Sequence, residues 1–332
     1  MSPHFDPDMD AQALEKAMKG LGTDENVIID ILGNRTVEQR QKIADVYKAC
    51  YGRDLLSRLK KELSGKFRKV VLASFFDRPH LHAYALFKAM AGMGTKERVI
   101  IQVVCTSNNA DIADLRDAYE EGMQSTLPTF IPHGIKQIKK KLWLNEGLAL
   151  RRNIEKDIRN DLSGDFEKFI VALLQGIRQQ GVDQLAAEAD ADALYSAGEE
   201  KLGTDEEVFT RIFARRSYKT IRLLDELYFQ KTGHDILHAI EKELSGDFKD
   251  AVKTVVKTAI KKEECIADMI RDSMKGVGTS DDDLIRLILA YAEASFIQKI
   301  WPKLRRYLRR KMVKRWRIGS RVMPMVIIPV SS

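Results

Sequence analysis

The 332-residue chain has no long apolar run. A membrane-spanning helix needs roughly 20 consecutive apolar residues, and no segment approaches that length. The first ten residues contain three aspartates, Asp6, Asp8 and Asp10, where a signal peptide would carry a basic and then an apolar stretch. We therefore expect neither a transmembrane helix nor a signal peptide.

Cysteine is also scarce. The three cysteines are odd in number, lie far apart and fall within apolar helical patterns; they are Cys50, Cys105 and Cys265. This usage is typical of buried thiols in a reducing compartment and not of a disulfide framework. The sequence therefore predicts a cytoplasmic protein.

Motifs that would indicate an enzyme are missing. The chain contains no Gly-x-x-x-x-Gly-Lys-Ser/Thr phosphate loop, no Gly-x-Ser-x-Gly elbow and no His-Glu-x-x-His pair. His234 and His238 have the spacing of a metal-binding pair, but a third ligand is not apparent nearby, so we interpret them as partly exposed helix residues. We do not expect an enzyme.

An excess of positive over negative charge occurs only at one end of the chain. The net charge is +7, yet the segment from Lys299 onward holds 11 Lys and Arg and no Asp or Glu, so the rest is mildly acidic. A nucleic-acid binder needs basic charge spread over a folded face. We therefore do not expect nucleic acid as a partner.

What the chain does contain is an internal repeat. A glycine loop ending in Gly-Thr occurs four times, at 19–23, 91–95, 200–204 and 275–279, and Leu-Ser-Gly-x-Phe, preceded by an acid, occurs at 63–67, 162–166 and 244–248. The acid follows the last loop glycine by 40 residues in copies one and three and by 67 in copy two. Copy two thus carries a 27-residue insertion.

Apolar residues between these motifs fall at helical spacing, and strand-like alternation is scarce. The pattern predicts an all-α fold, in which each loop threonine caps the next helix and Glu207 completes a capping box on Thr204. We interpret Ser-Gly as a second turn between helices, with the flanking Leu and Phe in the core.

The loop and the distant acid together indicate a calcium site. Glycines allow successive carbonyls to face one centre, and calcium accepts six to eight oxygen ligands in flexible geometry. An acid that ends a helix faces the negative end of the macrodipole, which a bound cation would relieve. A single such loop is more often an ordinary turn, but four copies, three with an acid, favour a site.

These motifs resemble those of the annexin family, whose repeats share the Lys-Gly-x-Gly-Thr loop and an acid about 40 residues on; the likeness runs from about Asp10 to Ala294. The resemblance implies a curved disc of four repeats with about five short helices each. It also implies calcium-dependent binding to phosphatidylserine-rich membranes, with Ca²⁺ bridging the loop to lipid phosphate.

The resemblance also implies the ligands. The metal ligands of repeats one to three would be the carbonyls of Met18, Gly20 and Gly22 with Glu62, those of Met90, Gly92 and Gly94 with Asp161, and those of Gly198, Lys201 and Gly203 with Glu243, the third loop being one residue longer. The apolar tips of the loops, Leu21, Met93, Leu202 and Val277, are candidates for membrane contact.

Repeat four departs from the pattern, because it keeps Met274, Gly276 and Gly278 but no acid occurs after Glu293. We expect an N-terminal tail (1–9), repeat one (10–77), repeat two (78–180, insertion about 123–149), repeat three (181–260), a partial repeat four (261–298) and a divergent basic tail (299–332).

The tail could form a basic amphipathic helix, so an alternative function is calcium-independent binding of anionic membrane, nucleic acid or calmodulin. Self-association on the membrane stays open.

Overall fold

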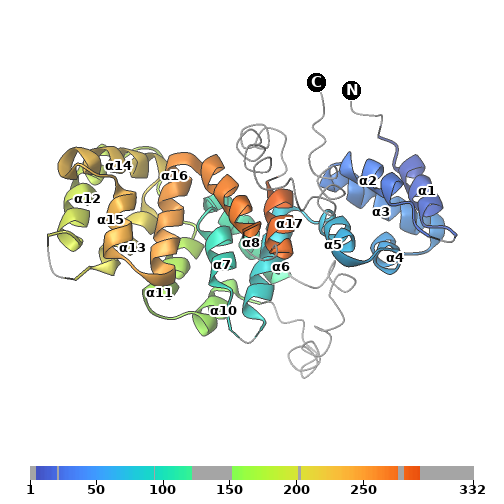
Figure 1. Cartoon of the computed structure of the whole chain (residues 1–332), viewed down its shortest axis with the longest axis horizontal. Coiled ribbons are helices and arrows are strands. Elements are labelled where there is room, and N and C mark those ends of the chain that lie inside the picture. Colours follow the sequence, from blue (N-terminus) through green and yellow to red (C-terminus); the bar gives the residue numbers. More distant parts are fainter. Residues whose placement is uncertain are drawn as a thin grey trace. The chain divides into compact units, whose positions relative to one another are not determined.

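The computed structural model describes residues 5–20, 22–92, 94–121, 152–200, 203–275 and 280–291. Every regular element within these ranges is an α-helix, which confirms the predicted fold class (Figure 1). The bulk of the predicted insertion and the whole basic tail lie outside the described residues. None of the described helices combines the length and apolar character needed to cross a membrane.

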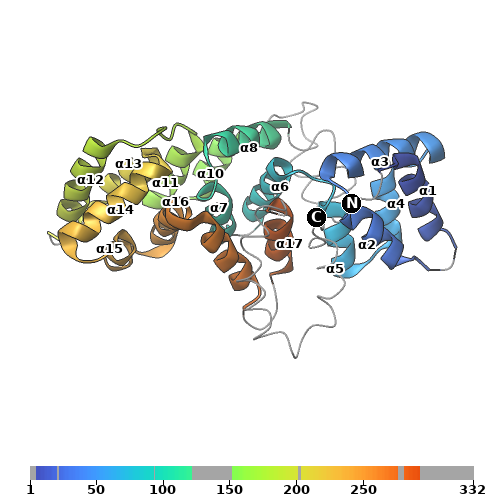
Figure 2. The same cartoon turned by 90° about the horizontal axis from the view of Figure 1, so that it is seen from above.

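The described residues divide into two compact units, and the first contains those within 5–81 and 270–291 together with Glu121. Its helices are α1 (Pro7–Ala17), α2 (Glu25–Gly33), α3 (Val37–Tyr51), α4 (Leu55–Glu62), α5 (Gly65–Ala73) and α17 (Asp281–Ala290). Helices α1 to α5 form one group in Figure 1 and Figure 2, and α17 packs on α5. This group contains five helices, as expected for one repeat.

The second unit contains 82–120 and 151–269. Its helices are α7 (Glu97–Val104), α8 (Asn109–Glu121), α10 (Ile154–Asp161), α11 (Gly164–Leu174), α12 (Gln184–Ala197), α13 (Glu206–Arg215), α14 (Tyr218–Thr232) and α15 (Ile236–Glu243). Two further helices, α6 (Arg78–Met90) and α16 (Gly246–Ser273), have residues in both units. Helix α16 is interrupted at Lys261, where the backbone is not helical.

Local sequence explains where the helices of repeat one begin and end. Asp6 accepts the backbone N–H groups of Asp8 and Met9, and Thr36 forms a capping box with Gln39 at the start of α3. Helix α3 ends at Gly52, whose φ of +63° suits glycine. The apolar faces then meet in a core of fully buried side chains, among them Leu14, Ile28, Leu32, Ile43, Leu55 and Leu59.

The Leu-Ser-Gly-x-Phe motif forms the second turn, as predicted. Its serines precede α5, α11 and α16, and its glycines have φ of +58°, +65° and +60°. The flanking apolar residues are buried in all three copies: Leu63, Phe67, Leu162, Phe166, Leu244 and Phe248. The motif is therefore a structural turn anchored in the core.

A buried ion pair repeats in both units, and sequence reasoning did not find it. Arg35 Nε donates to Asp10 Oδ2 at 2.6 Å in repeat one, and Arg216 Nε donates to Asp190 Oδ2 at 2.5 Å in repeat three. The two aspartates are at most 8 % exposed. Each pair joins the first helix of its repeat to a residue just after the second helix.

Two expectations for single residues need correction. Cys105 and Cys265 are buried, and burial raises the pKa of both thiols, but Cys50 is exposed on the polar face of α3. His234 lies in the turn before α15 and not in a helix, and its Nε2 is 3.1 Å from Glu199 Oε2. The expectation for Cys50 fails because α3 has an exposed face, and that for His234 fails because α14 ends at Gly233, whose φ is +83°.

His80 gives the fold a pH-dependent contact. Its Nδ1 lies 2.6 Å from Asp77 Oδ1, and this hydrogen bond raises the pKa of His80 above its usual value, although partial burial opposes the rise. The protonated imidazole therefore stabilises the folded state below about pH 6.5, and that contribution is lost as pH rises through the folded pKa. We expect His80→Gln to lower the melting temperature more at pH 6 than at pH 9. Equal losses measured by calorimetry at both pH values would contradict this role.

Candidate functional site

Each glycine loop is closed by the same backbone hydrogen bond. The bonds run from Asp24 N to Ala17 O at 2.9 Å, from Lys96 N to Ala89 O at 3.1 Å, from Asp205 N to Ala197 O at 2.9 Å and from Ser280 N to Ser273 O at 2.9 Å. The third bond spans one residue more than the others, in agreement with the longer loop predicted there. The four loops are thus variants of one turn.

The loop glycines are required by backbone conformation. Gly20, Gly22, Gly94 and Gly203 have φ of +109°, +91°, +83° and +88°, values that side-chain-bearing residues rarely adopt. A Cβ placed on any of the four would meet no atom within 4 Å, so crowding is not the reason. The path of the chain, which decides where the loop carbonyls point, is what needs glycine.

The three acids end their helices, as the sequence predicts. Helices α4, α10 and α15 have Glu62, Asp161 and Glu243 as their last residues. In each case the next leucine closes the helix with a backbone bond of 2.9 to 3.1 Å. Each carboxylate therefore lies at the negative end of a helix dipole, where a cation would be favoured.

A threonine hydroxyl joins each loop to its acid. Thr23 Oγ1 donates to Glu62 Oε2 at 3.1 Å, Thr95 Oγ1 donates to Asp161 Oδ2 at 3.2 Å, and Thr204 Oγ1 donates to Glu243 Oε2 at 3.2 Å. Residues 39 or 66 positions apart are thereby brought together in three copies. The structure places loop and acid at one locus in each of the first three repeats.

The predicted role of the threonines as helix caps is therefore wrong. The N-cap of α2 is Asp24 and that of α13 is Asp205, and their carboxylates accept the first amides of those helices. In the second copy the N-cap is Lys96, which makes no side-chain cap bond. Since the threonine faces the acid, the residue after it takes the capping position, and Glu207 donates its amide to Asp205 in place of a box with Thr204.

Repeat three shows why Gly198 is a glycine. A Cβ at this position would lie 2.9 Å from Cγ and 3.2 Å from Cδ of Glu243, so the acid's stem rests on the glycine backbone. Gly198 has a negative φ, so only the close approach requires glycine here. Two of the four ligands predicted for this repeat, Gly198 and Glu243, are therefore adjacent, and another, Lys201, lies outside the described residues.

Helix α4 places a cation, Arg58, against the loop of repeat one, and the sequence analysis missed it. Arg58 Nη2 donates to Met18 O at 2.7 Å, and Arg58 Nη1 lies 2.9 Å from Glu62 Oε1. The guanidinium thus contacts two of the four groups predicted to hold a metal. The sequence does contain a signal for this contact, because Arg58 and Glu62 are four residues apart and side chains at that spacing meet on one face of a helix.

Not all predicted site residues can be placed. The loop tips Leu21, Met93, Leu202 and Val277, together with Gly276 and Gly278, lie outside the described residues. Met274 follows α16 directly, and its amide bonds to Arg271 O at 3.1 Å. Beyond the fourth loop, Asp281 and Asp282 form exposed ion pairs of 2.8 Å with Lys66 and Lys69 of α5.

The donor set around each acid consists of oxygen. One carboxylate, a threonine hydroxyl and the main-chain carbonyls of the loop suit a hard cation such as Ca²⁺. Across the residues that the structure describes, no three His, Cys, Asp or Glu side chains gather closely enough to hold a metal ion. A cation at these loops would therefore depend on backbone oxygens.

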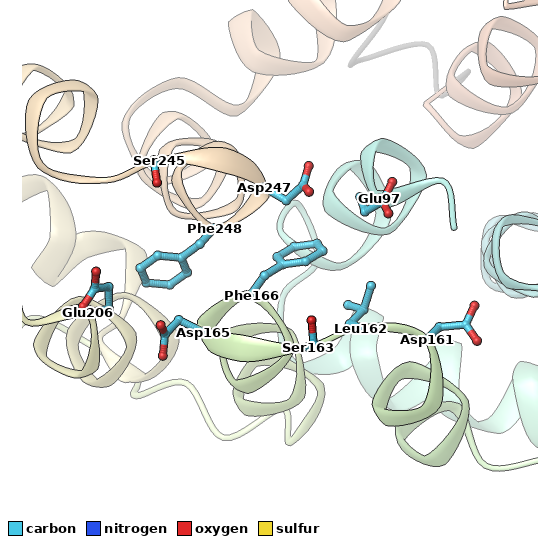
Figure 3. A pocket seen from close by; sticks show the side chains of 10 residues that line it. All are labelled: Glu97, Asp161, Leu162, Ser163, Asp165, Phe166, Glu206, Ser245, Asp247 and Phe248. Atoms are coloured by element: carbon cyan, nitrogen blue, oxygen red, sulfur yellow. The ribbon is translucent and has the colours of Figure 1, made fainter. Parts of the chain in front are cut away.

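An acidic hollow of about 320 Å³ lies in the second unit (Figure 3). Its carboxylates are Glu97, Asp161, Asp165, Glu206 and Asp247, and Phe166 and Phe248 form its apolar part. Burial, Glu97 and Asp250 together raise the pKa of Asp247. In Figure 3 the Asp161 carboxylate points away from the two phenylalanines, so this acid lies at the edge of the hollow.

Known proteins resemble the chain over most of its length. The family model described as Annexin matches residues 9–73, 81–134 and 189–255. Human annexin A13 is 41 % identical over 87 % of this chain and 84 % of its own length. Human annexin A7 is 37 % identical over 89 % of this chain, which spans about half of that longer protein (55 %). The crystal structure of calcium-bound annexin (Sm)1 superimposes with a TM-score of 0.75 at 30 % identity, covering 97 % of this chain and 89 % of the other.

The contact between threonine and acid should stabilise the third loop more than the second. Thr204 Oγ1 also reaches Glu243 O at 2.9 Å and is partly buried, whereas Thr95 Oγ1 is 3.5 Å from Asp161 O and exposed. We expect Thr204→Val to lower the free energy of unfolding in chelator by about 1 kcal/mol. Thr95→Val is the matched control and should cost less. A larger loss in the control, measured by urea denaturation, would contradict the assignment.

Proposed function

Because the chain belongs to the annexin family, we propose that it binds acidic, phosphatidylserine-rich membranes when calcium is present. The observation that carries this proposal is the repeated meeting of a glycine loop with a helix-terminal acid through a threonine hydroxyl. A calcium-bound annexin of the same fold supports the choice of ion. The chain would be a peripheral membrane protein, with no catalytic role proposed.

We assign the ligands of two sites as the sequence predicts. The loop carbonyls of Met90, Gly92 and Gly94 serve with Asp161 in repeat two, and those of Gly198, Lys201 and Gly203 serve with Glu243 in repeat three. The Thr95 and Thr204 hydroxyls orient the two carboxylates by donating to one oxygen of each. Repeat one has the corresponding ligands, Met18, Gly20, Gly22 and Glu62. The Arg58 side chain contacts two of them, Met18 and Glu62.

Charge explains why the membrane would complete the site. Three neutral carbonyls and one carboxylate leave a divalent ion with net positive charge and unfilled coordination positions. When bound, Ca²⁺ supplies an electrophilic centre that accepts oxygen atoms of a lipid phosphate. Lipid phosphate fills those positions, so the membrane raises the affinity for calcium, and by linkage calcium raises the affinity for the membrane to the same extent.

The repeat boundaries given above remain our proposal for the domain organisation. A second function through the basic tail has no support from the described residues, which end at Tyr291. It would be detected in the experiment below as membrane binding that survives chelation. Self-association on the membrane is not needed for the proposed mode of binding.

The test is sedimentation with phosphatidylserine vesicles over a series of calcium concentrations, followed by chelation. We expect the wild-type protein to pellet at millimolar calcium and to be released by chelator. The triple variant Glu62→Gln, Asp161→Asn and Glu243→Gln should stay in the supernatant with unchanged helical content, because each loop has lost its carboxylate.

A control variant separates the site from overall charge. Asp45→Asn, Asp117→Asn and Glu226→Gln remove one exposed carboxylate from the third helix of each of the first three repeats, away from the loops. This control should pellet like the wild type. Calcium-dependent pelleting by the triple loop variant, or pelleting of the wild type in chelator, would contradict the proposal.

A further inference from the structure

We propose that Arg58 is an internal cation that holds the loop of repeat one closed, so that calcium binds there only by displacing the Arg58 guanidinium. This inference rests on the proposed function and concerns one of its three sites. It predicts that site one is the weakest of the three, although it keeps both loop glycines and the acid.

Geometry is the first support. Arg58 Nη2 is 2.7 Å from Met18 O, and Nη1 is 2.9 Å from Glu62 Oε1. The second Glu62 oxygen accepts the Thr23 hydroxyl at 3.1 Å. Both oxygens of the acid and one loop carbonyl are thereby engaged, and these are groups that a calcium ion would need.

The same position in the other repeats carries no such cation. One helical turn before the acid, repeat two has Asp157 and repeat three has Ala239. Asp157 accepts the Tyr119 hydroxyl at 2.7 Å and pairs with Arg152 at 2.8 Å, and Ala239 is buried. Neither residue can donate to a loop carbonyl. The closed arrangement is therefore particular to repeat one among the described loops.

Electrostatics gives the direction of the effect. A guanidinium satisfies the carboxylate and the dipole at the end of α4 with a single positive charge, and it cannot lose its proton in a protein. A divalent ion would have to approach this charge or move it. Either event weakens calcium binding relative to repeat three, where the cation paired with Glu243 is the exposed Lys242, whose ammonium lies 3.7 Å from the carboxylate.

The guanidinium can be displaced without disrupting the core. The Arg58 side chain is 24 % exposed and that of Glu62 is 22 % exposed, so both reach solvent. Within the described part of the chain, the buried Arg58 Nε has no hydrogen-bond partner. Moving the head group outward therefore breaks two hydrogen-bonded contacts and returns Nε to water.

Direct calcium binding tests the proposal. The background is Asp161→Asn with Glu243→Gln, which leaves site one as the only loop of the first three with its acid. Bound ⁴⁵Ca is measured by equilibrium sedimentation with phosphatidylserine vesicles, for this background and after adding Arg58→Gln. We expect Arg58→Gln to lower the calcium midpoint, the calcium concentration at which half of the sites are filled, at least about tenfold. Removing one adjacent like charge has an effect of this size on a cation equilibrium.

Two further variants make the result decisive. Lys61→Gln removes the same charge from an exposed position of α4 and should change the midpoint less than about threefold at physiological salt, because exposed charges are screened. Arg58→Met keeps an apolar stem without charge, and it replaces Arg58→Gln should the latter fail to fold by circular dichroism.

The outcomes separate this proposal from the general one. An unchanged midpoint in the Arg58 variants, a shift of equal size in Lys61→Gln, or no calcium bound by site one after Arg58 is removed would each overturn the inference. The proposed function fails on a different result, namely wild-type protein that does not pellet with calcium. A wild type that pellets while the Arg58 variants match their background refutes only the inference.

Discussion

The hydrogen bond between a loop threonine and a helix-terminal acid is the contact on which the account depends. It joins segments 39 residues apart in repeats one and three and 66 apart in repeat two. Without it, each carboxylate would lose the hydroxyl that fixes one of its oxygens at the unfavourable end of the helix dipole. With it, one oxygen of the acid is directed at the loop, and the glycine backbone can present carbonyls to the same place.

The architecture around this contact varies little between repeats. The third loop is longer by one residue, and two contacts reflect this. The backbone bond that closes the loop, from Asp205 N to Ala197 O, spans one residue more than in the other loops. The buried pair of Asp190 and Arg216 likewise has one more intervening residue than the pair of Asp10 and Arg35. The extra residue is accommodated within the loop. The helices, the acid and the buried ion pair keep their relations, so local variation in the loop leaves the scaffold intact.

Much of this arrangement could be predicted from the sequence because periodic features carry it. Helical spacing gave the fold class, and the acid before Leu-Ser-Gly gave the helix end at Glu62, Asp161 and Glu243. The role of the threonines could not be predicted, because Thr and the Asp after it are both good helix caps and only three-dimensional packing decides between them. Cys50 was misjudged for a similar reason, since its helix has one exposed face.

Arg58 shows a further limit of sequence reasoning. A ligand set is inferred from the residues that match a pattern, whereas a competitor for the site is a residue that the pattern does not mention. Arg58 is recognised as a competitor only from the structure, in which its side chain contacts both Met18 O and Glu62. Three loops with the same signature are therefore not three equal sites, because the charge next to each acid differs.

A crystal structure of the protein grown with calcium would show where the ion binds. We predict ions at the loops of repeats two and three, each about 2.3 to 2.6 Å from loop carbonyl oxygens and from Asp161 or Glu243. Calcium bound instead in the acidic hollow beside Asp165 and Asp247, with the loops free of metal, would contradict this prediction.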